Sequence, residues 1–332
     1  MPGRAATSAD VARQAGVSRA TVSYVLNERP GHALPETTRQ RVLTAARDLG
    51  YVPNHSARAL RGKQPPVILV ILRPVPFGRN IGGILDELTA LAHRHGCSLV
   101  TQHADTPDAL EATLAHLRPR LALSILPLEP ADLGALERLR IPVVDGWRIR
   151  GGADGQAARL QVETLAAAGR SRLAYLGVAE DELRVFEEAR RAGVTDTCAQ
   201  LGLPLPQTAA VTMSSTPRTG AELQRILRAW TSQPEPVDGV ACYNDVWAAA
   251  LLRAARDQDI SVPNAVSVIG MDDEPMGAFL EPPLTTIDLD VSELSRELFA
   301  RGLSLLGEEV GELGERADSD SGRFTLIERG SV

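Results

Sequence analysis

The chain has 332 residues, 44% of them apolar, which is enough for about two or three domains with packed cores. No run approaches the roughly 18 apolar residues of a membrane-spanning helix, and the first residues lack the basic and then apolar order of a signal peptide, so we expect neither a membrane protein nor a secreted one. The net charge of −7 is unevenly distributed along the chain. Residues 1–63 carry ten Arg and Lys and four Asp and Glu, whereas the remaining residues carry 25 Arg and Lys and 38 Asp and Glu. This distribution predicts a nucleic-acid-binding head on a body that does not bind phosphates.

Residues 8–27 predict two short helices joined by a tight turn. Ser8 and Ser18 can each cap a helix, and Gly16 suits the sharp exit from the first one. In each helix the apolar residues recur at helical spacing, so we expect the apolar faces of the two helices to pack against each other. Small, polar and basic residues remain on the outward face of the second helix: Arg19, Ala20, Thr21, Ser23, Tyr24 and Asn27. Such a face suits entry into a DNA major groove, as in a helix-turn-helix, although a helical hairpin that binds nothing has the same pattern.

A third helix is expected to open at Pro35 and end at Gly50, which completes a head over residues 1–52. Residues 53–64 then predict a conditional linker, since about two turns of helix are marginal alone. Arg58 and Arg61 can meet phosphates there. Leu60 is an apolar group that could wedge between base steps from the minor groove, or simply rest on the next domain.

Residues 65–332 alternate between strands and helices, which predicts parallel sheets with helices on both faces. The first expected strand, VILVIL at 67–72, is a continuous apolar run typical of a strand buried on both sides. A glycine-rich break near residue 150 divides the alternation and favours two similar lobes. The charged, glycine-rich stretch from 307 to 322 is expected to be a surface loop before a last strand, RFTLIE.

Motifs along the whole chain resemble the LacI/GalR family of bacterial repressors. SADVARQAGVSRATVSYVLN, LPETTRQRVLTAARDLGYVPN and HSARALR are similar to its head and hinge; YNDVWAAALL, ISVPNAVSVIGMDD and PPLTTID are similar to its body. The resemblance implies an all-α helix-turn-helix head and an α/β, periplasmic-binding-protein-like body. Three chain crossings between the lobes would place lobe 1 at about 65–153 and 283–332, and lobe 2 at about 154–282. The resemblance also implies a homodimer that reads a pseudo-palindromic operator, and a small molecule in the cleft that alters DNA affinity.

The resemblance assigns roles to residues of the head. Arg19, Ala20 and Tyr24 occupy places that choose the operator, and Leu60 matches a minor-groove leucine. Tyr24 stands where the family frequently has arginine, and tyrosine cannot make arginine's bidentate contact to guanine. Leu34 stands where the family often has a capping serine, and leucine cannot cap a helix. The full set of expected DNA-binding residues is Ser18, Arg19, Ala20, Thr21, Ser23, Tyr24, Asn27, Asn54, Arg58 and Leu60.

For the effector, Arg190 matches the family's Arg-x-x-Gly position, and Asn244 and Asp272 match ligand positions just after two strands. Asp145 is a weaker match. Their donors and acceptors suit a polyol, sugar or nucleoside. An aromatic face for a sugar could come from Phe77, Trp147, Trp247 or Phe279. For Asp245 and Asp273 we favour a structural role, in which each braces a following segment. Arg190 and Asp272 could pair with each other in an unliganded cleft. The expected effector-binding residues are Phe77, Asp145, Arg190, Asn244 and Asp272.

No catalytic set stands out, since GxSxG, the phosphate loop and HExxH are absent. His93 and His95 are two residues apart and point to different helix faces, so we expect no metal site and no cofactor. Cys97, Cys198 and Cys242 are far apart and odd in number, which favours buried thiols in a reducing cytoplasm. An enzyme and a transport-type solute-binding protein remain the alternatives to a regulator. The C-terminal end shows no leucine heptad, which favours a dimer over a tetramer.

Overall fold

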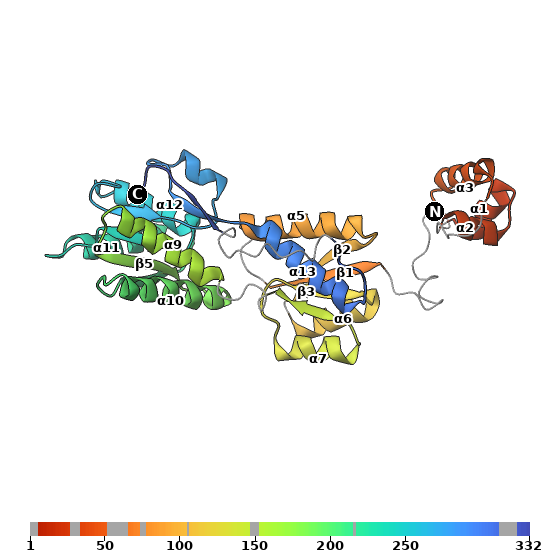
Figure 1. Ribbon diagram of the computed structural model, residues 1–332, viewed down its shortest axis with the longest axis horizontal. Helices are drawn as coiled ribbons and strands as arrows, with labels where there is room; N and C mark the ends of the chain where they lie inside the picture. The colour runs from red at the N-terminus through yellow and green to blue at the C-terminus, as the bar shows by residue number, and fades with distance from the viewer. Residues whose placement is uncertain are drawn as a thin grey trace. The chain divides into compact units, whose positions relative to one another are not determined.

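The computed structural model describes residues 6–26, 34–51, 66–73, 78–104, 106–146, 153–214, 217–311 and 324–332. The chain divides into two compact units, Met1–Pro65 and Pro66–Val332 (Figure 1). The expected hinge at 53–64 lies outside the described residues. Within the described segments, none of the helices is long and apolar enough to cross a membrane.

The first unit contains three helices around a small apolar core. They are α1 (Ser8–Ala15), α2 (Arg19–Leu26) and α3 (Glu36–Asp48). Val11, Val22 and Val42, one from each helix, are almost fully buried and meet in one cluster. The core therefore fixes the orientation of α2 through its apolar side.

Capping interactions fix where α1 begins and ends and where α2 begins. Thr7, not Ser8 as the sequence predicts, caps α1, because its hydroxyl accepts from the Asp10 backbone N–H while Asp10 accepts from Thr7. Gly16 has φ +65°, a left-handed conformation that glycine adopts without strain, and it ends α1. Ser18 caps α2 as predicted, since its Oγ accepts from the Thr21 N–H at 3.0 Å.

Sheet A of the second unit has four parallel strands in the order β2-β1-β3-β4. Its elements are β1 (Val67–Leu72), α5 (Arg79–Arg94), β2 (Ser98–His103), α6 (Pro107–Leu117), β3 (Leu121–Ser124), α7 (Pro130–Arg138) and β4 (Val143–Asp145). Ile68 and Val70 of β1 pack toward α5 on one face, whereas Leu69 and Ile71 pack toward α6 and α7 on the other. The uninterrupted VILVIL run is thus shared between two cores, as the period of two in a strand requires.

Sheet B has the same parallel arrangement, in the order β6-β5-β7-β8. Its elements are α9 (Ala153–Ala167), β5 (Leu173–Val178), η1 (Asp181–Leu183), α10 (Arg184–Gln200), β6 (Gln207–Val211), α11 (Pro217–Thr231), β7 (Gly239–Cys242), α12 (Asp245–Arg256), β8 (Ser267–Ile269) and η2 (Pro275–Phe279). Leu176 of β5 belongs to the core under α11 and α12, and Tyr175 to the core under α9 and α10.

The last elements are β9 (Thr286–Leu289), α13 (Val291–Leu305) and β10 (Phe324–Ile327). Helix α13 packs with α5 on sheet A, through Leu298 and Phe299. Strands β9 and β10 instead form an antiparallel pair that packs with the α9 and α10 side of sheet B. Ser331 is fully buried there and donates to the Val268 carbonyl at 2.6 Å.

This packing differs from the expected lobe limits. The sequence predicts that 283–332 belongs wholly to lobe 1, but in the described part of that range α13 and the residues up to Val310 pack with sheet A, whereas β9 and β10 pack with sheet B. The apolar side chains of β10 alternate weakly and carry no signal of which sheet they cover. Hereafter lobe 1 means sheet A with its helices and α13, and lobe 2 means sheet B with its helices, β9 and β10.

Candidate functional site

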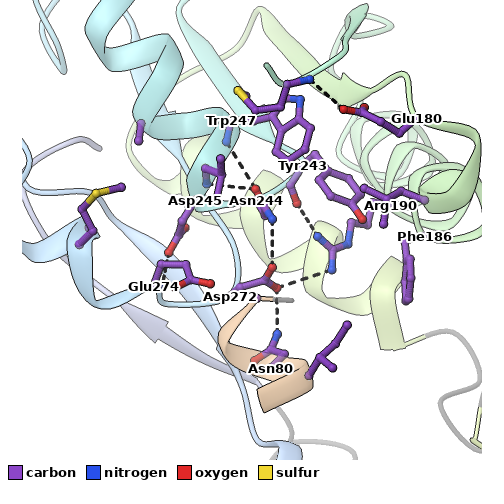
Figure 2. A pocket seen from close by; sticks show the side chains of 18 of the residues that line it. Asn80, Glu180, Phe186, Arg190, Tyr243, Asn244, Asp245, Trp247, Asp272 and Glu274 are labelled. Carbon is purple, nitrogen blue, oxygen red and sulfur yellow. Dashed lines mark hydrogen bonds and ion pairs between the residues drawn. The ribbon is translucent and has the colours of Figure 1, made fainter. Parts of the chain in front are cut away.

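A pocket of about 440 Å³ opens where the carboxyl ends of the strands of sheet B face the N-terminal end of α5. This size lies within the range of about 300–1,000 Å³ that is usual for small-molecule sites. Loops that follow parallel strands meet at one edge of their sheet, which is why residues far apart in sequence converge here. Figure 2 shows the polar ones: Asn80, Glu180, Arg190, Asn244, Asp245, Asp272 and Glu274.

Arg190 of α10 is the buried cation of this pocket. Only 4% of its surface is exposed, and its Nε donates to Asp154 at 3.0 Å while Nη1 donates to the Tyr243 carbonyl at 2.5 Å. Its Nη2 lies 3.6 Å from Asp272, and its guanidinium carbon sits 4.5 Å from the centre of the Tyr243 ring. Burial opposes its charge, but the carboxylates of Asp272 and Asp154 outweigh burial and raise the pKa of Arg190. The guanidinium is therefore permanently charged and fixed in place.

Asp272 joins the two lobes across the pocket. Its carboxylate accepts from Asn80 Nδ2 of lobe 1 at 2.9 Å and from Asn244 Nδ2 of lobe 2 at 3.3 Å (Figure 2). Asn244 is oriented because its Oδ1 caps α12, accepting from the Val246 and Trp247 N–H groups. A ligand that displaces the Asn80 contact therefore also changes what holds the lobes together.

Asp245 lies under the pocket and fastens the loop that carries Asp272. Its carboxylate accepts from the Glu274 N–H at 2.7 Å and from the Thr286 hydroxyl at 2.6 Å. Burial raises the pKa of Asp245 to about 7, although both hydrogen bonds act in the opposite direction. A Cβ at Gly270 would lie 2.0 Å from this carboxylate, so only glycine leaves room for it.

Aromatic and aliphatic side chains form the rest of the wall. Phe186, Tyr243 and Trp247 line it together with aliphatic residues, and the Tyr243 and Trp247 rings meet edge to face at 5.2 Å. Trp247 is anchored because its Nε1 donates to the Val211 carbonyl at 3.1 Å. The pocket thus combines a polar cluster with an apolar wall, which suits a ligand with hydroxyl groups on a carbon skeleton.

Comparisons with known proteins match both units. The family model described as "Bacterial regulatory proteins, lacI family" matches residues 7–54, and the model "Periplasmic binding protein-like domain" matches residues 162–332. The regulator MalR of Streptomyces coelicolor is 33% identical over 331 residues, which cover 91% of this chain and 90% of that protein. The chain belongs to the LacI family.

Other members of the LacI family extend this result. GntR of Pseudomonas aeruginosa is 31% identical over 324 residues, covering 91% of this chain and 90% of that protein. Both relatives are HTH-type transcriptional regulators. This LacI-family chain is accordingly a DNA-binding transcriptional regulator and not an enzyme.

Solved structures agree with the fold. A lac repressor dimer bound to operator and the anti-inducer ONPF superposes with a TM-score of 0.77 at 23% identity, covering 99% of each chain. A complex of the transcriptional regulator CelR with cellobiose gives a TM-score of 0.64 at 22% identity, covering 98% of this chain and all of that one. The expected fold class, a helix-turn-helix head and a two-lobed body with parallel sheets, is confirmed.

The expected effector residues fall into three groups. Arg190, Asn244 and Asp272 meet in the pocket, and the expected pairing of Arg190 with Asp272 is present. Asp145 ends β4 but is not among the described residues that line the pocket. Phe77 lies outside the described residues, as does Trp147. Of the other aromatic candidates, Trp247 lines the pocket, whereas Phe279 is 88% exposed.

Several lining residues escape prediction from the sequence. Asn80 sits at the start of α5, and Glu180 and Glu274 follow strands β5 and β8. Glu180 could have been predicted from its place just after a buried strand, because the prediction of Asn244 used a place of the same kind. Nothing in the sequence places Asn80 beside Asp272, since the two are 192 positions apart and come from different lobes.

The expected DNA-binding residues of the head share one helix and its cap. Ser18, Arg19 and Ala20 are exposed, and Thr21, Ser23 and Tyr24 are half-buried. Asn27, Asn54, Arg58 and Leu60 lie outside the described residues. The exposed start of α2 is therefore available for a groove, while Val22 and Val25 hold the opposite side in the core.

Proposed function

We propose that this regulator is a cytoplasmic repressor that binds a pseudo-palindromic operator as a homodimer and releases or tightens it when a sugar or nucleoside-like effector enters the pocket. The observation that carries the proposal is the Asp272 carboxylate, which contacts Asn80 in lobe 1 and Asn244 and Arg190 in lobe 2. An effector that competes for these groups changes the contacts between the lobes. A differential contact of this kind is what a two-state coupling of about 1–3 kcal/mol requires.

In the head, we propose that residues Ser18 to Asn27 enter the major groove, with Arg19, Ala20 and Tyr24 choosing bases. Arg19 is exposed at the first position of α2, where a recognition helix reaches base edges. For the hinge, the proposal rests on sequence and family resemblance: Asn54 and Arg58 contact the backbone, and Leu60 wedges into the minor groove. Two recognition helices in a dimer would then read half-sites about one helical turn apart.

The test is a fluorescence titration of the full chain with duplex DNA from around its own gene, with a scrambled duplex as control. We expect tight binding to one pseudo-palindromic site and a steep loss of affinity as salt rises, because phosphate contacts release counterions. Equal and weak binding to both duplexes, unchanged by a pool of sugars and nucleosides, would overturn the proposal.

The pocket assignment is tested in the same assay. Asn80→Ala removes one lobe-to-lobe contact while leaving the buried Arg190 pairs intact. We expect it to change operator affinity in the absence of effector and to shift the effector concentration at half-response. Asn264→Ala is the matched control, since Asn264 is exposed on a loop and its side-chain amide donates to Ser261, outside the pocket. Identical behaviour of the two variants would contradict the role of the pocket.

A further inference from the structure

The described wall of the pocket is rich in acceptors and poor in free donors. It contains four carboxylates, Glu180, Asp245, Asp272 and Glu274, and Arg190 is the one cation among the lining residues that the structure describes. A ligand that enters this space meets an excess of negative charge, which a low-dielectric wall screens less than water does.

Arg190 is poorly placed to receive an anionic ligand. Its Nε is engaged by Asp154, its Nη1 by the Tyr243 carbonyl, and its Nη2 faces Asp272. Tyr243 also covers the guanidinium. The bidentate fork that would grip a phosphate or carboxylate is therefore already directed at protein oxygens.

Glu180 and Glu274, in contrast to Arg190, retain capacity to bind groups of a ligand. Among the described residues, Glu180 accepts backbone N–H groups, from Met213 at 2.8 Å and Ala179 at 3.1 Å, and Glu274 accepts the Arg79 N–H at 2.9 Å. No Lys, Arg or His among the described residues forms a salt bridge with either carboxylate. Each carboxylate offers about four acceptor positions, so both retain capacity for ligand donors. In Figure 2 the two lie at opposite sides of the polar cluster.

We propose that the pocket selects an effector with several hydroxyl or amine donors and no anionic group, and that Glu180 and Glu274 enforce this choice. A phosphate or carboxylate on the ligand would face these carboxylates, and Arg190, the one cation among the described lining residues, is already paired; an ammonium group would be attracted. The inference rests on the proposed function, because it concerns the effector of that same pocket.

The test measures binding of matched ligands to the full chain by calorimetry. The probes are glucose and galactose, each with its amino-sugar and phosphate monoester, and adenosine with AMP. We expect a neutral or amino member to bind, and its phosphorylated counterpart to bind about 10- to 100-fold more weakly. In Glu180→Gln and in Glu274→Gln this ratio should shrink by about tenfold, since glutamine keeps an acceptor and loses the charge.

Glu188→Gln is the matched control, because Glu188 is exposed on α10, changes the net charge equally and does not line the pocket. Its ratio should equal that of the parent chain. Tighter binding of a phosphorylated member, or a ratio unmoved in both pocket variants, overturns this inference and leaves the proposed function standing. Failure of every probe to bind overturns the proposed sugar or nucleoside effector itself, and this inference with it.

Discussion

The Asp245 carboxyl makes stability depend on pH in a direction that can be worked out. Its pKa is raised to about 7 in the folded chain, mainly by burial, whereas the unfolded chain has an ordinary carboxyl near the reference of about 3.9. Between these values the folded chain holds a proton that the unfolded chain has lost. The contribution of Asp245 therefore favours folding at acidic pH, and it is lost as pH rises toward about 7.

Asp245→Asn should remove this part of the pH dependence. The amide imitates the protonated carboxyl, so we expect the free energy of unfolding of the variant to fall less than that of the parent between about pH 5 and 7. Urea titrations at several pH values measure the difference. Asp196→Asn serves as the control, since Asp196 is exposed on α10; equal slopes for parent and Asp245→Asn would contradict the prediction.

Arg190 should contribute strongly to stability because of what its removal exposes. Arg190→Ala removes the guanidinium that pairs with the buried carboxylate of Asp154, which is 3% exposed. Removing one partner of a buried pair costs about 3–5 kcal/mol. The neighbouring Arg191 is half-exposed and lies 3.8 Å from Glu187, so Arg191→Ala should cost less than about 1 kcal/mol. Urea denaturation of both variants checks the contrast, and similar losses would refute it.

At the scale of elements, α9 and α10 cross at a pair of glycines. A Cβ added at Gly193 would lie 2.5 Å from the Gly155 carbonyl oxygen, so the two backbones touch where no side chain fits. This contact brings Arg190, one turn earlier in α10, beside Asp154 in α9. The Arg-x-x-Gly spacing is thereby explained by the packing of the two helices.

Gly193→Ala should push the two helices apart and destabilise lobe 2 by about 1–3 kcal/mol, as overpacking does. Gly220→Ala in α11 meets nothing within 4 Å and should be neutral or stabilising by up to about 1 kcal/mol. Thermal melts of the two variants provide the measurement. A stable Gly193→Ala protein with unchanged effector binding would show that the close approach is not required.

The positions of most helices and strands were predictable, because hydrophobic periodicity and the residues that end an element are local features of the sequence. The VILVIL strand, the strand–helix alternation and the Gly16 turn follow from side-chain spacing and backbone preference. The predicted N-cap of α1 was wrong by one residue. Thr7 and Ser8 both offer a hydroxyl group, and the capping box with Asp10 forms with Thr7. The cross-lobe contact of Asn80 with Asp272 was not predictable, because it depends on how two sheets are placed.

At the scale of the whole molecule, DNA binding should depend on the hinge residue Leu60 more than on any charge of the acidic body. We expect Leu60→Ala to bend operator DNA less and to bind it about 10- to 100-fold more weakly, because the variant loses the side chain proposed to wedge between base steps. Circular-permutation gel shifts measure the bend. Unchanged affinity and bend would make the wedge mechanism wrong, and Leu201→Ala, a change at a half-exposed leucine of the body, controls for general effects.

The return of the chain's last segment to lobe 2 has a consequence for synthesis on the ribosome. Lobe 1 lacks a helix of its core until α13 has emerged, and lobe 2 lacks β10 and the buried Ser331 until residues 324–332 have done so. The three helices of the head, in contrast, are contiguous and complete by residue 51. Since domains fold as units during translation at about 5–20 residues per second, a nascent chain carries a finished head for about 13–51 seconds before lobe 1 can close and for about 14–56 seconds before lobe 2 can. During that interval the body's apolar faces are open, and its exposure to chaperones is set by translation speed.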